Sequence, residues 1–240
     1  MKKHIPNFIT LLNLFSGCIA LVFALQGDLQ LAALFVGIAA LMDFLDGFFA
    51  RLLKVTSKIG KDLDSLADVV SFGVVPGAVL FALLKESLGT FVTSEPTQLL
   101  IPFAGFIIPM FSALRLAKFN SDPRQEEAFY GLPTPANAMF VASLPLILLQ
   151  TSNLLGIEMA YLHRGLLNPV SLLALIIILS WLLIADFRLL SLKFKSLGWK
   201  QNKARFIFLI LSALLILLLY FAAAPFILLL YILISLTMKV

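Results

Sequence analysis

Residues 29–53 read LQLAALFVGIAALMDFLDGFFARLL, an apolar run whose charged residues are Asp43, Asp46 and Arg51. About 20 predominantly apolar residues are enough to cross the hydrocarbon core of a bilayer as an α-helix. An aspartate at the centre of such a helix costs about 2.5–3.5 kcal/mol on insertion scales, so neither carboxylate is expected to face lipid. The stretch therefore predicts a membrane-spanning helix with two carboxylates turned toward a polar site inside the protein.

The rest of the chain has the same apolar character. Of its 240 residues, 61% are hydrophobic and 13% are charged, whereas a typical soluble domain has roughly 45–50% and about 25%. This composition excludes a soluble globule, a disordered chain and a collagen-like protein. The single cysteine, Cys18, allows no internal disulfide, and two histidines far apart in sequence exclude a His/Cys zinc cluster.

Apolar runs of sufficient length predict about eight membrane-spanning helices, at residues 5–25, 29–53, 65–84, 98–117, 134–151, 168–186, 205–221 and 224–238. The last two share one apolar stretch, which we divide at Ala222–Pro225 because proline stops or kinks a helix. A single kinked helix is the alternative, and it would move the C-terminus to the other side of the membrane. The expected fold is all-α and polytopic, with a six-helix core in residues 1–190 and a basic connection and helical hairpin in residues 191–240.

The positions of the cations predict the orientation in the membrane. All but two of the 18 Lys and Arg residues fall on the side of the predicted termini, and only Lys85 and Arg164 fall on the other. Because cytoplasmic loops carry the excess of Lys and Arg, we expect both termini and the polar site on the cytoplasmic side of the cytoplasmic (inner) membrane. The cations form short clusters without a continuous basic face, so no nucleic-acid partner is expected.

Four aspartates are spaced so that they can converge. Asp43 and Asp46 are three residues apart near the cytoplasmic end of the second span, and Asp64 and Asp68 are four apart near the start of the third. Either spacing keeps both side chains on one helix face, and a short connection makes the two helices antiparallel. Asp62 falls off this face and is expected to be solvated.

Carboxylates without His or Cys select hard cations, with Mg²⁺ or Mn²⁺ first and Ca²⁺ possible. Two such ions would clamp a diphosphate, and the small residues Gly47, Ala50 and Gly60 on the same faces leave room for it. The pattern thus predicts metal-assisted phosphoryl chemistry at a membrane surface. An ion or proton relay in a transporter is the alternative, because carboxylates within a membrane often serve that purpose.

These residues together read Asp43-x2-Asp46-Gly47-x2-Ala50-Arg51-x8-Gly60-x3-Asp64-x3-Asp68. This pattern resembles the full signature of the CDP-alcohol phosphatidyltransferase family, with each defined position at its expected spacing. The resemblance implies that Asp43, Asp46 and Asp64 ligate two metal ions. It also implies that Asp68 completes the site and takes the proton from the incoming alcohol, and that Gly47, Ala50 and Gly60 line the CDP moiety.

Within the family, residues 5–13, 64–76, 115–120 and 129–136 are most similar to the bacterial members that use serine. The resemblance implies transfer of the phosphatidyl group of CDP-diacylglycerol to the hydroxyl of L-serine, giving phosphatidylserine and CMP, by a homodimer. A loop at residues 130–137 is expected to close over the site. The candidate serine-binding residues are Arg115, Lys118, Asn120 and Ser71, with Lys118 standing where arginine is common in such enzymes.

Other residues keep two interpretations each. Arg51 either binds the nucleotide phosphate or extends to the membrane surface beside Lys54. Asn7 and Thr10, on one polar stripe of the first helix, either line the CDP site or hydrogen-bond between helices. The same chemistry with another alcohol, such as glycerol 3-phosphate or an inositol phosphate, is the nearest alternative function.

Overall fold

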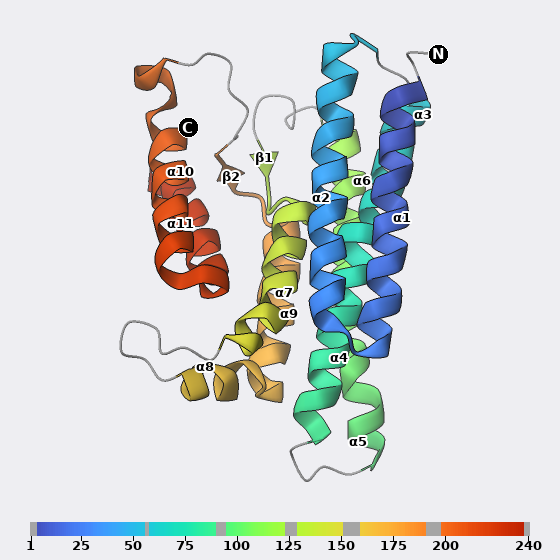
Figure 1. Ribbon diagram of the computed structural model, residues 1–240, viewed down its shortest axis with the longest axis vertical. Helices are drawn as coiled ribbons and strands as arrows, with labels where there is room; N and C mark the ends of the chain where they lie inside the picture. The colour runs from blue at the N-terminus through green and yellow to red at the C-terminus, as the bar shows by residue number, and fades with distance from the viewer. Residues whose placement is uncertain are drawn as a thin grey trace.

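The computed structural model describes residues 4–55, 58–89, 95–122, 129–150, 159–190 and 198–237, which are almost entirely helical (Figure 1). The α-helices are α1 (His4–Gln26), α2 (Leu29–Leu52), α3 (Lys58–Val69), α4 (Val75–Gly89), α5 (Glu95–Leu100), α6 (Ile107–Ser121), α7 (Thr134–Leu149), α8 (Met159–Leu166), α9 (Pro169–Ile184), α10 (Trp199–Leu219) and α11 (Ala223–Thr237). A π-helical turn, η1 (Val70–Val74), joins α3 to α4, and the 3₁₀ segments η2 (Ile101–Phe106) and η4 (Tyr220–Ala222) precede α6 and α11. Two short strands, β1 (Phe129–Tyr130) and β2 (Arg188–Leu189), complete the fold.

Five helical segments of the described chain are long and apolar enough to cross a membrane. They are His4–Gln26, Leu29–Leu52, Ile59–Gly89, Gln98–Ser121 and Asn202–Thr237, and Thr134–Leu149 and Pro169–Ile184 are shorter apolar helices. Large apolar side chains such as Phe8, Ile177 and Leu217 are more than 60% exposed on the outside of these helices, as expected where the surrounding medium is hydrocarbon. The all-α, polytopic membrane fold is thereby confirmed.

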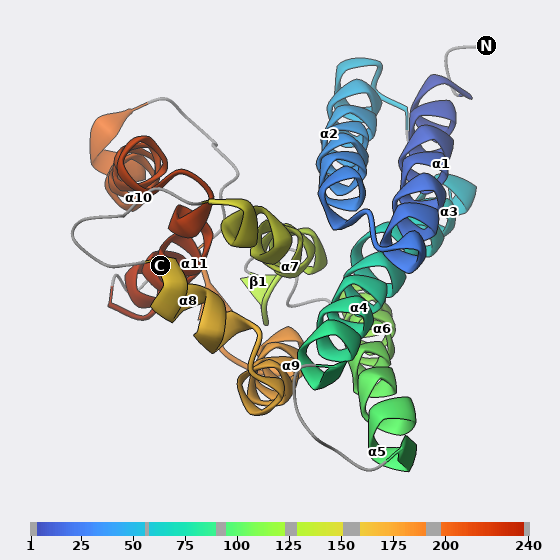
Figure 2. The same ribbon diagram turned by 60° about the horizontal axis from the view of Figure 1, so that its bottom comes forward.

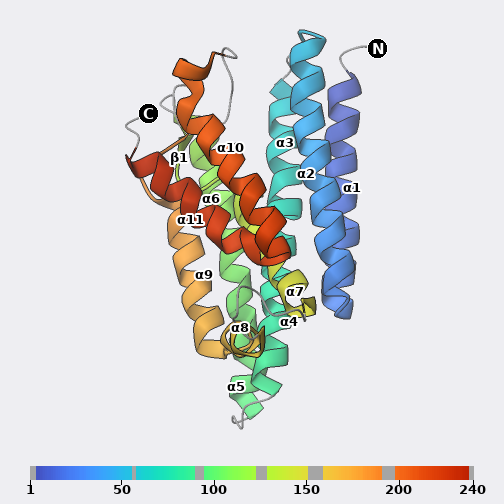
Figure 3. The same cartoon turned by 60° about the vertical axis from the view of Figure 1, so that its left-hand side comes forward.

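The apolar stretch at the C-terminal end is a helical hairpin (Figure 3). The backbone of Tyr220 takes φ 49° and ψ −123°, which ends α10, and α11 packs back against it. The break therefore begins two residues before the predicted position at Ala222–Pro225. Pro225 is the third residue of α11, where its missing N–H removes no helical hydrogen bond.

The arrangement of the helices separates two ends of the molecule. Helix α1 begins and α11 ends toward the end where α2 leads into α3, whereas α5 and α8 lie at the opposite end (Figure 1). Lys85 lies in the last turns of α4, beside α5, and Arg164 lies in α8. The two cations that the sequence assigns to the far side therefore belong to that opposite end.

Helix α4 and the segment η2 approach one another at backbone distance. A Cβ atom built on Gly105 would lie 2.6 Å from the carbonyl oxygen of Gly77 and 2.7 Å from the backbone nitrogen of Phe81. A Cβ atom on Gly73 would lie 3.1 Å from Cβ of Ser112. We call Gly73, Gly77 and Gly105 the glycine seam; it fixes the third and fourth spans against each other.

The strands tie the start of α7 to the end of α9. Phe129 pairs with Leu189 and Tyr130 with Arg188 in antiparallel register, and the backbone N–H of Leu132 donates to the carbonyl of Leu182 at 2.8 Å. The segment expected as a loop at residues 130–137 thus consists of the last residue of β1, a three-residue connection and the first turn of α7.

Helix α11 is held to the end of β2. The backbone N–H of Leu190 donates to Ser235 Oγ at 2.9 Å, and the hydroxyl of Tyr231 donates to the carbonyl of Leu190 at 3.0 Å. Viewed from another direction, α7 lies between the α1–α2 pair and this C-terminal hairpin (Figure 2).

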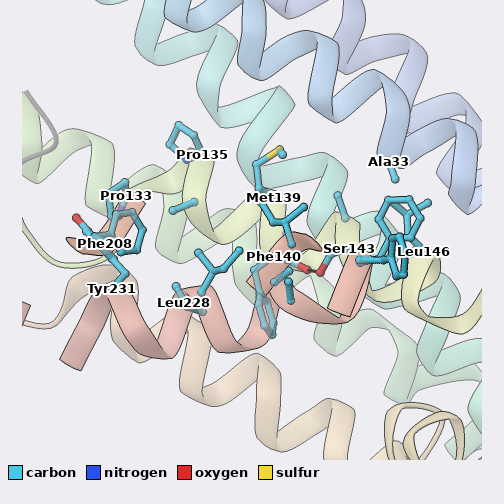
Figure 4. A pocket seen from close by; sticks show the side chains of 18 residues that line it. Ala33, Pro133, Pro135, Met139, Phe140, Ser143, Leu146, Phe208, Leu228 and Tyr231 are labelled. Atoms are coloured by element: carbon cyan, nitrogen blue, oxygen red, sulfur yellow. Dashed lines mark hydrogen bonds between the residues drawn. The ribbon is translucent and has the colours of Figure 1, made fainter. Parts of the chain in front are cut away.

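An apolar groove of about 730 Å³ runs between α7 and the C-terminal hairpin. Met139, Phe140 and Leu146 line it from α7, Phe208 from α10, and Leu228 and Tyr231 from α11 (Figure 4). Its lining is almost wholly hydrocarbon, as suits a cavity that takes an apolar ligand.

Candidate metal centre

Helices α2 and α3 bring three of the predicted aspartates together. One carboxylate oxygen from each of Asp43, Asp64 and Asp68 lies within 4.8 Å of the other two. Asp43 comes from α2, and Asp64 and Asp68 come from successive turns of α3. The i, i+4 spacing on α3 and the antiparallel connection produce this convergence, as the sequence predicts.

The donor set fits a divalent cation. Asp68 is only 7% exposed, and Oδ1 of Asp64 is buried and accepts no hydrogen bond from any described residue. Three carboxylates so close together repel one another unless a cation lies among them. Oxygen-only donors select Mg²⁺, Mn²⁺ or Ca²⁺, so this acidic cluster could bind a metal ion.

Asp46 lies beside this triad but outside the group of oxygens within 4.8 Å. Its side chain is 8% exposed, and its Oδ2 accepts a hydrogen bond from the hydroxyl of Thr10 at 2.6 Å. The Thr10 hydroxyl is also 3.0 Å from the carbonyl of Pro6. Of the two interpretations of Thr10, the structure contains the hydrogen bond between helices.

A second contact from α1 reaches the triad. Asn13 Nδ2 donates to Oδ1 of Asp68 at 3.2 Å, and the hydroxyl of Ser71 donates to the backbone carbonyl of Asn13 at 3.1 Å. Gly17, one turn further along α1, lies so close to Ser71 that a Cβ atom on it would be 2.9 Å from Ser71 Cα. Ser71, a predicted serine contact, therefore joins η1 to α1 and positions Asn13.

The predicted small residues lie beside the carboxylates. Gly47 and Ala50 on α2 and Gly60 on α3 are partly exposed, so this side of the site is not fully covered by other described residues. A Cβ atom on Gly47 would be 3.4 Å from one guanidinium nitrogen of Arg51. The Arg51 side chain thus lies back along α2 toward Asp46. Asn7 is partly exposed one turn before Thr10.

Arg115 is buried next to the triad. It is 6% exposed, its Nε donates to the carbonyl of Leu132 at 2.7 Å, and its guanidinium lies 5.4 Å from the ring centre of Phe119. It interacts electrostatically with Asp68 and with Tyr231 of α11. Arg115 therefore connects the carboxylates, the β1–α7 connection and the C-terminal hairpin.

The two other residues that the sequence predicts for serine binding on α6 are Lys118, which is exposed, and Asn120, which is hydrogen-bonded to α3. Lys118 is exposed one turn after Arg115. The Asn120 side chain donates to Ser65 Oγ at 2.7 Å, and its backbone carbonyl accepts from Lys61 Nζ at 3.3 Å. Asn120 thus links α6 to α3.

A cavity of about 330 Å³ lies beside Arg115, away from the apolar groove's lining. Its polar lining residues are Arg115, Lys118, Ser121, Asp122, Tyr130 and Asp186. The apolar residues 183–185, at the end of α9, line the rest. We call it the polar cavity. Sequence reasoning missed Asp122 and Asp186, because each is a single acid at the end of a helix and belongs to no periodic pattern.

The chain matches the family model described as CDP-alcohol phosphatidyltransferase over residues 3–238. It is 36% identical over 153 residues to the CDP-diacylglycerol–serine O-phosphatidyltransferase of Mycobacterium leprae, covering 61% of this chain and 48% of that protein. It is 32% identical over 146 residues to the protein of the same name in Bacillus subtilis, covering 59% and 75%. It is 36% identical over 157 residues to the protein of that name in Saccharomyces cerevisiae, covering 59% of this chain and 53% of that protein. The matched region thus spans about half the length of the mycobacterial and yeast relatives.

Proposed function

The chain belongs to the CDP-alcohol phosphatidyltransferase family, and on that basis we propose that it transfers the phosphatidyl group of CDP-diacylglycerol to L-serine. The products are phosphatidylserine and CMP. The observation that carries the proposal is the triad of Asp43, Asp64 and Asp68, with the buried cation Arg115 next to Asp68. The shared name of the mycobacterial, Bacillus and yeast relatives supports serine as the acceptor.

In this proposal Asp43, Asp46, Asp64 and Asp68 hold two divalent ions, Mg²⁺ or Mn²⁺. Bound ions neutralise the diphosphate and the charge that develops on the departing CMP. The orphaned Oδ1 of Asp64 supports a ligand role. The carboxylate oxygen of Asp46 that does not accept from Thr10 would be the one to hold an ion.

The chain's own residues carry the acceptor step. Asp68 removes the proton from the serine hydroxyl, and Asn13 holds the Asp68 carboxylate in position by its hydrogen bond to Oδ1. Serine Oγ forms a bond to the lipid-side phosphorus, and the bond from that phosphorus to the oxygen of CMP breaks. Gly47, Ala50 and Gly60 leave room for the cytidine diphosphate, and Arg51 pairs with its phosphate.

Serine binds in the polar cavity, whose wall includes Arg115, the cation that interacts electrostatically with Asp68. Its carboxylate pairs with Arg115, with Lys118 adding a second positive charge from the cavity wall. The donor enters from the membrane, and one acyl chain lies in the apolar groove between α7 and the hairpin. In this arrangement the water-soluble acceptor lies in the polar cavity and an acyl chain of the donor lies in the apolar groove.

The distribution of cations supports an inner-membrane protein with its site and both termini in the cytoplasm. Lys85 lies in α4 and Arg164 in α8, near the end of the molecule opposite to the connection between α2 and α3 (Figure 1). This placement agrees with the proposed orientation. The proposed homodimer follows from family membership.

The test is release of CMP by the purified protein in detergent. With CDP-diacylglycerol and L-serine, we expect release that stops on chelation and returns with Mg²⁺ or Mn²⁺. Glycerol 3-phosphate and an inositol phosphate, supplied one at a time, should support little release. Release with either of these and none with serine would reassign the acceptor. Absence of metal-dependent release with every acceptor would contradict the transferase and favour a transporter.

Replacing Arg115 with alanine should raise the KM for serine by roughly a hundredfold, because a buried charged partner of the carboxylate is lost. The KM for CDP-diacylglycerol should change far less. Steady-state CMP release with each substrate varied in turn measures both constants. Arg188→Ala, which removes an exposed cation from β2, is the matched control and should change neither. An equal rise in both constants for Arg115→Ala would remove Arg115 from serine recognition.

A further inference from the structure

The polar cavity carries charges of both signs. Arg115 and Lys118 line it from α6, while Asp122 follows α6 and Asp186 lies between α9 and β2. The carboxylate of Asp186 is thus on a different element from the two cations. A pocket built only to hold a phosphate or a carboxylate would gain nothing from an acid in its wall, because like charges repel.

Backbone hydrogen bonds set where Asp186 stands relative to Arg115. The N–H of Leu132 donates to Leu182, and the N–H of Gly131 donates to Phe187 at 3.2 Å, so both sides of Asp186 are bonded to one short segment. The carbonyl of the same Leu132 accepts from Arg115 Nε. The Arg115 guanidinium and the backbone on both sides of Asp186 are therefore bonded to one pair of adjacent residues, Gly131 and Leu132, while the Asp186 side chain itself is exposed.

We propose that Asp186 is a specificity-determining residue that binds the α-ammonium group of the acceptor. The acceptor class is then an amino acid with a hydroxyl group, its carboxylate on Arg115 and its ammonium on Asp186. The inference rests on the proposed function and adds to it the reason for choosing a zwitterion. Asp122, on the same wall as the cations, contributes a second negative charge to the cavity.

This arrangement also works against the competing acceptors. Glycerol 3-phosphate and inositol phosphates have no cationic group to pair with Asp186, so their bound phosphate would face a carboxylate of like charge. Specificity is a difference between two affinities, and a repulsive group against the wrong ligand contributes to it as much as an attractive one. In this proposal Asp186 attracts the ammonium group of serine and repels the phosphate of the competing acceptors.

The experiment compares L-serine with 3-hydroxypropanoate, which keeps the hydroxyl and carboxylate and lacks the ammonium group. In the parent protein, serine should be preferred by kcat/KM. In Asp186→Asn, the KM for serine should rise about tenfold or more, while the constants for 3-hydroxypropanoate and CDP-diacylglycerol stay within about twofold. The preference for serine should therefore shrink by the same factor, and Asp186→Glu should restore part of it. Asp62→Asn, an exposed acid on α3, is the control and should keep the preference.

Two results would overturn the assignment. An unchanged serine preference in Asp186→Asn would mean that the acid does not contact the ammonium, and an equal loss with both acceptors would mean a purely structural role. Binding of radiolabelled L-serine to the purified protein without donor lipid separates this inference from the proposed function. Serine binding that Asp186→Asn weakens, in a protein that releases no CMP, would retain the ammonium site and reject the reaction. Absence of serine binding and of serine-dependent release in the parent protein would reject both.

Discussion

Asp68→Asn is expected to lower the rate of CMP release by at least about a thousandfold at saturating substrates and metal. A positioned general base contributes a factor of about 10²–10⁴, and the asparagine also removes one negative charge from the triad. Asp68 is the most enclosed of the three side chains and the one that Asn13 holds. The rate of CMP release by the purified variant, measured over a range of Mg²⁺ concentrations, checks the prediction.

The metal titration distinguishes the two roles of these carboxylates. Asp64→Asn removes a proposed ligand, so part of its activity should return as the Mg²⁺ concentration is raised. Because Asp68 is proposed as the base as well as a ligand, most of the loss in Asp68→Asn should persist at every Mg²⁺ concentration. Asp62→Asn, two residues before Asp64 and exposed, is the matched control on the same helix and should retain the parent rate. Near-normal release by Asp68→Asn would show that another group takes the proton.

Gly105→Ala is expected to destabilise the fold more than any other single methyl addition in the glycine seam. The new Cβ would lie 2.6 Å and 2.7 Å from backbone atoms of Gly77 and Phe81, and backbone of a helix cannot rotate away as a side chain does. Overpacking costs about 1–3 kcal/mol, and contact with backbone on both sides argues for the upper end. For a chain of this length that corresponds to a Tm lower by roughly 5–10 °C, measured as the loss of monodisperse protein after heating in detergent.

Gly37→Ala provides the control for this substitution. Gly37 lies inside α2, and a Cβ atom there would meet no other atom within 4 Å. Alanine is the better helix former by roughly 0.8–1.0 kcal/mol, so this variant should be as stable as the parent or more so. A Gly105→Ala protein with the parent's Tm would mean that α4 and η2 separate easily, contrary to the close approach of their backbones.

The sequence predicts those features that depend on spacing along one helix. The apolar run at residues 29–53 gives α2 to within one residue at its end, and the four-residue spacing of Asp64 and Asp68 gives the shared face. Their meeting with Asp43 follows from a short connection between antiparallel helices. The predicted division of the chain after residue 190 stays a prediction.

Features that depend on contacts between distant segments escape the same reasoning. The hydrogen bond from Thr10 to Asp46 joins residues 36 positions apart, and nothing in either helix alone distinguishes it from a contact with nucleotide. Strands of two residues are too short to show alternation, so β1 and β2 leave no periodic signal. The helix break at Tyr220 comes from a positive φ at a non-glycine residue, whereas the sequence draws attention to Pro225.

The π-helical turn at Val70–Val74 determines which neighbouring helices α3 and α4 face, although the two form one continuous helical segment. Each α-helical residue advances about 100° around the axis. The extra residue in the wider π turn therefore rotates the side chains of α4 around the helix axis relative to those of α3. Asp64 and Asp68, before the turn, face Asn13 of α1 and Asp43 of α2. Gly73 within the turn and Gly77 after it face α6 and η2. The direction of the carboxylates on α3 can thus change independently of the direction of the glycines on α4. Deleting one residue from the π turn would keep the segment helical but rotate α4 away from its contacts with α6 and η2.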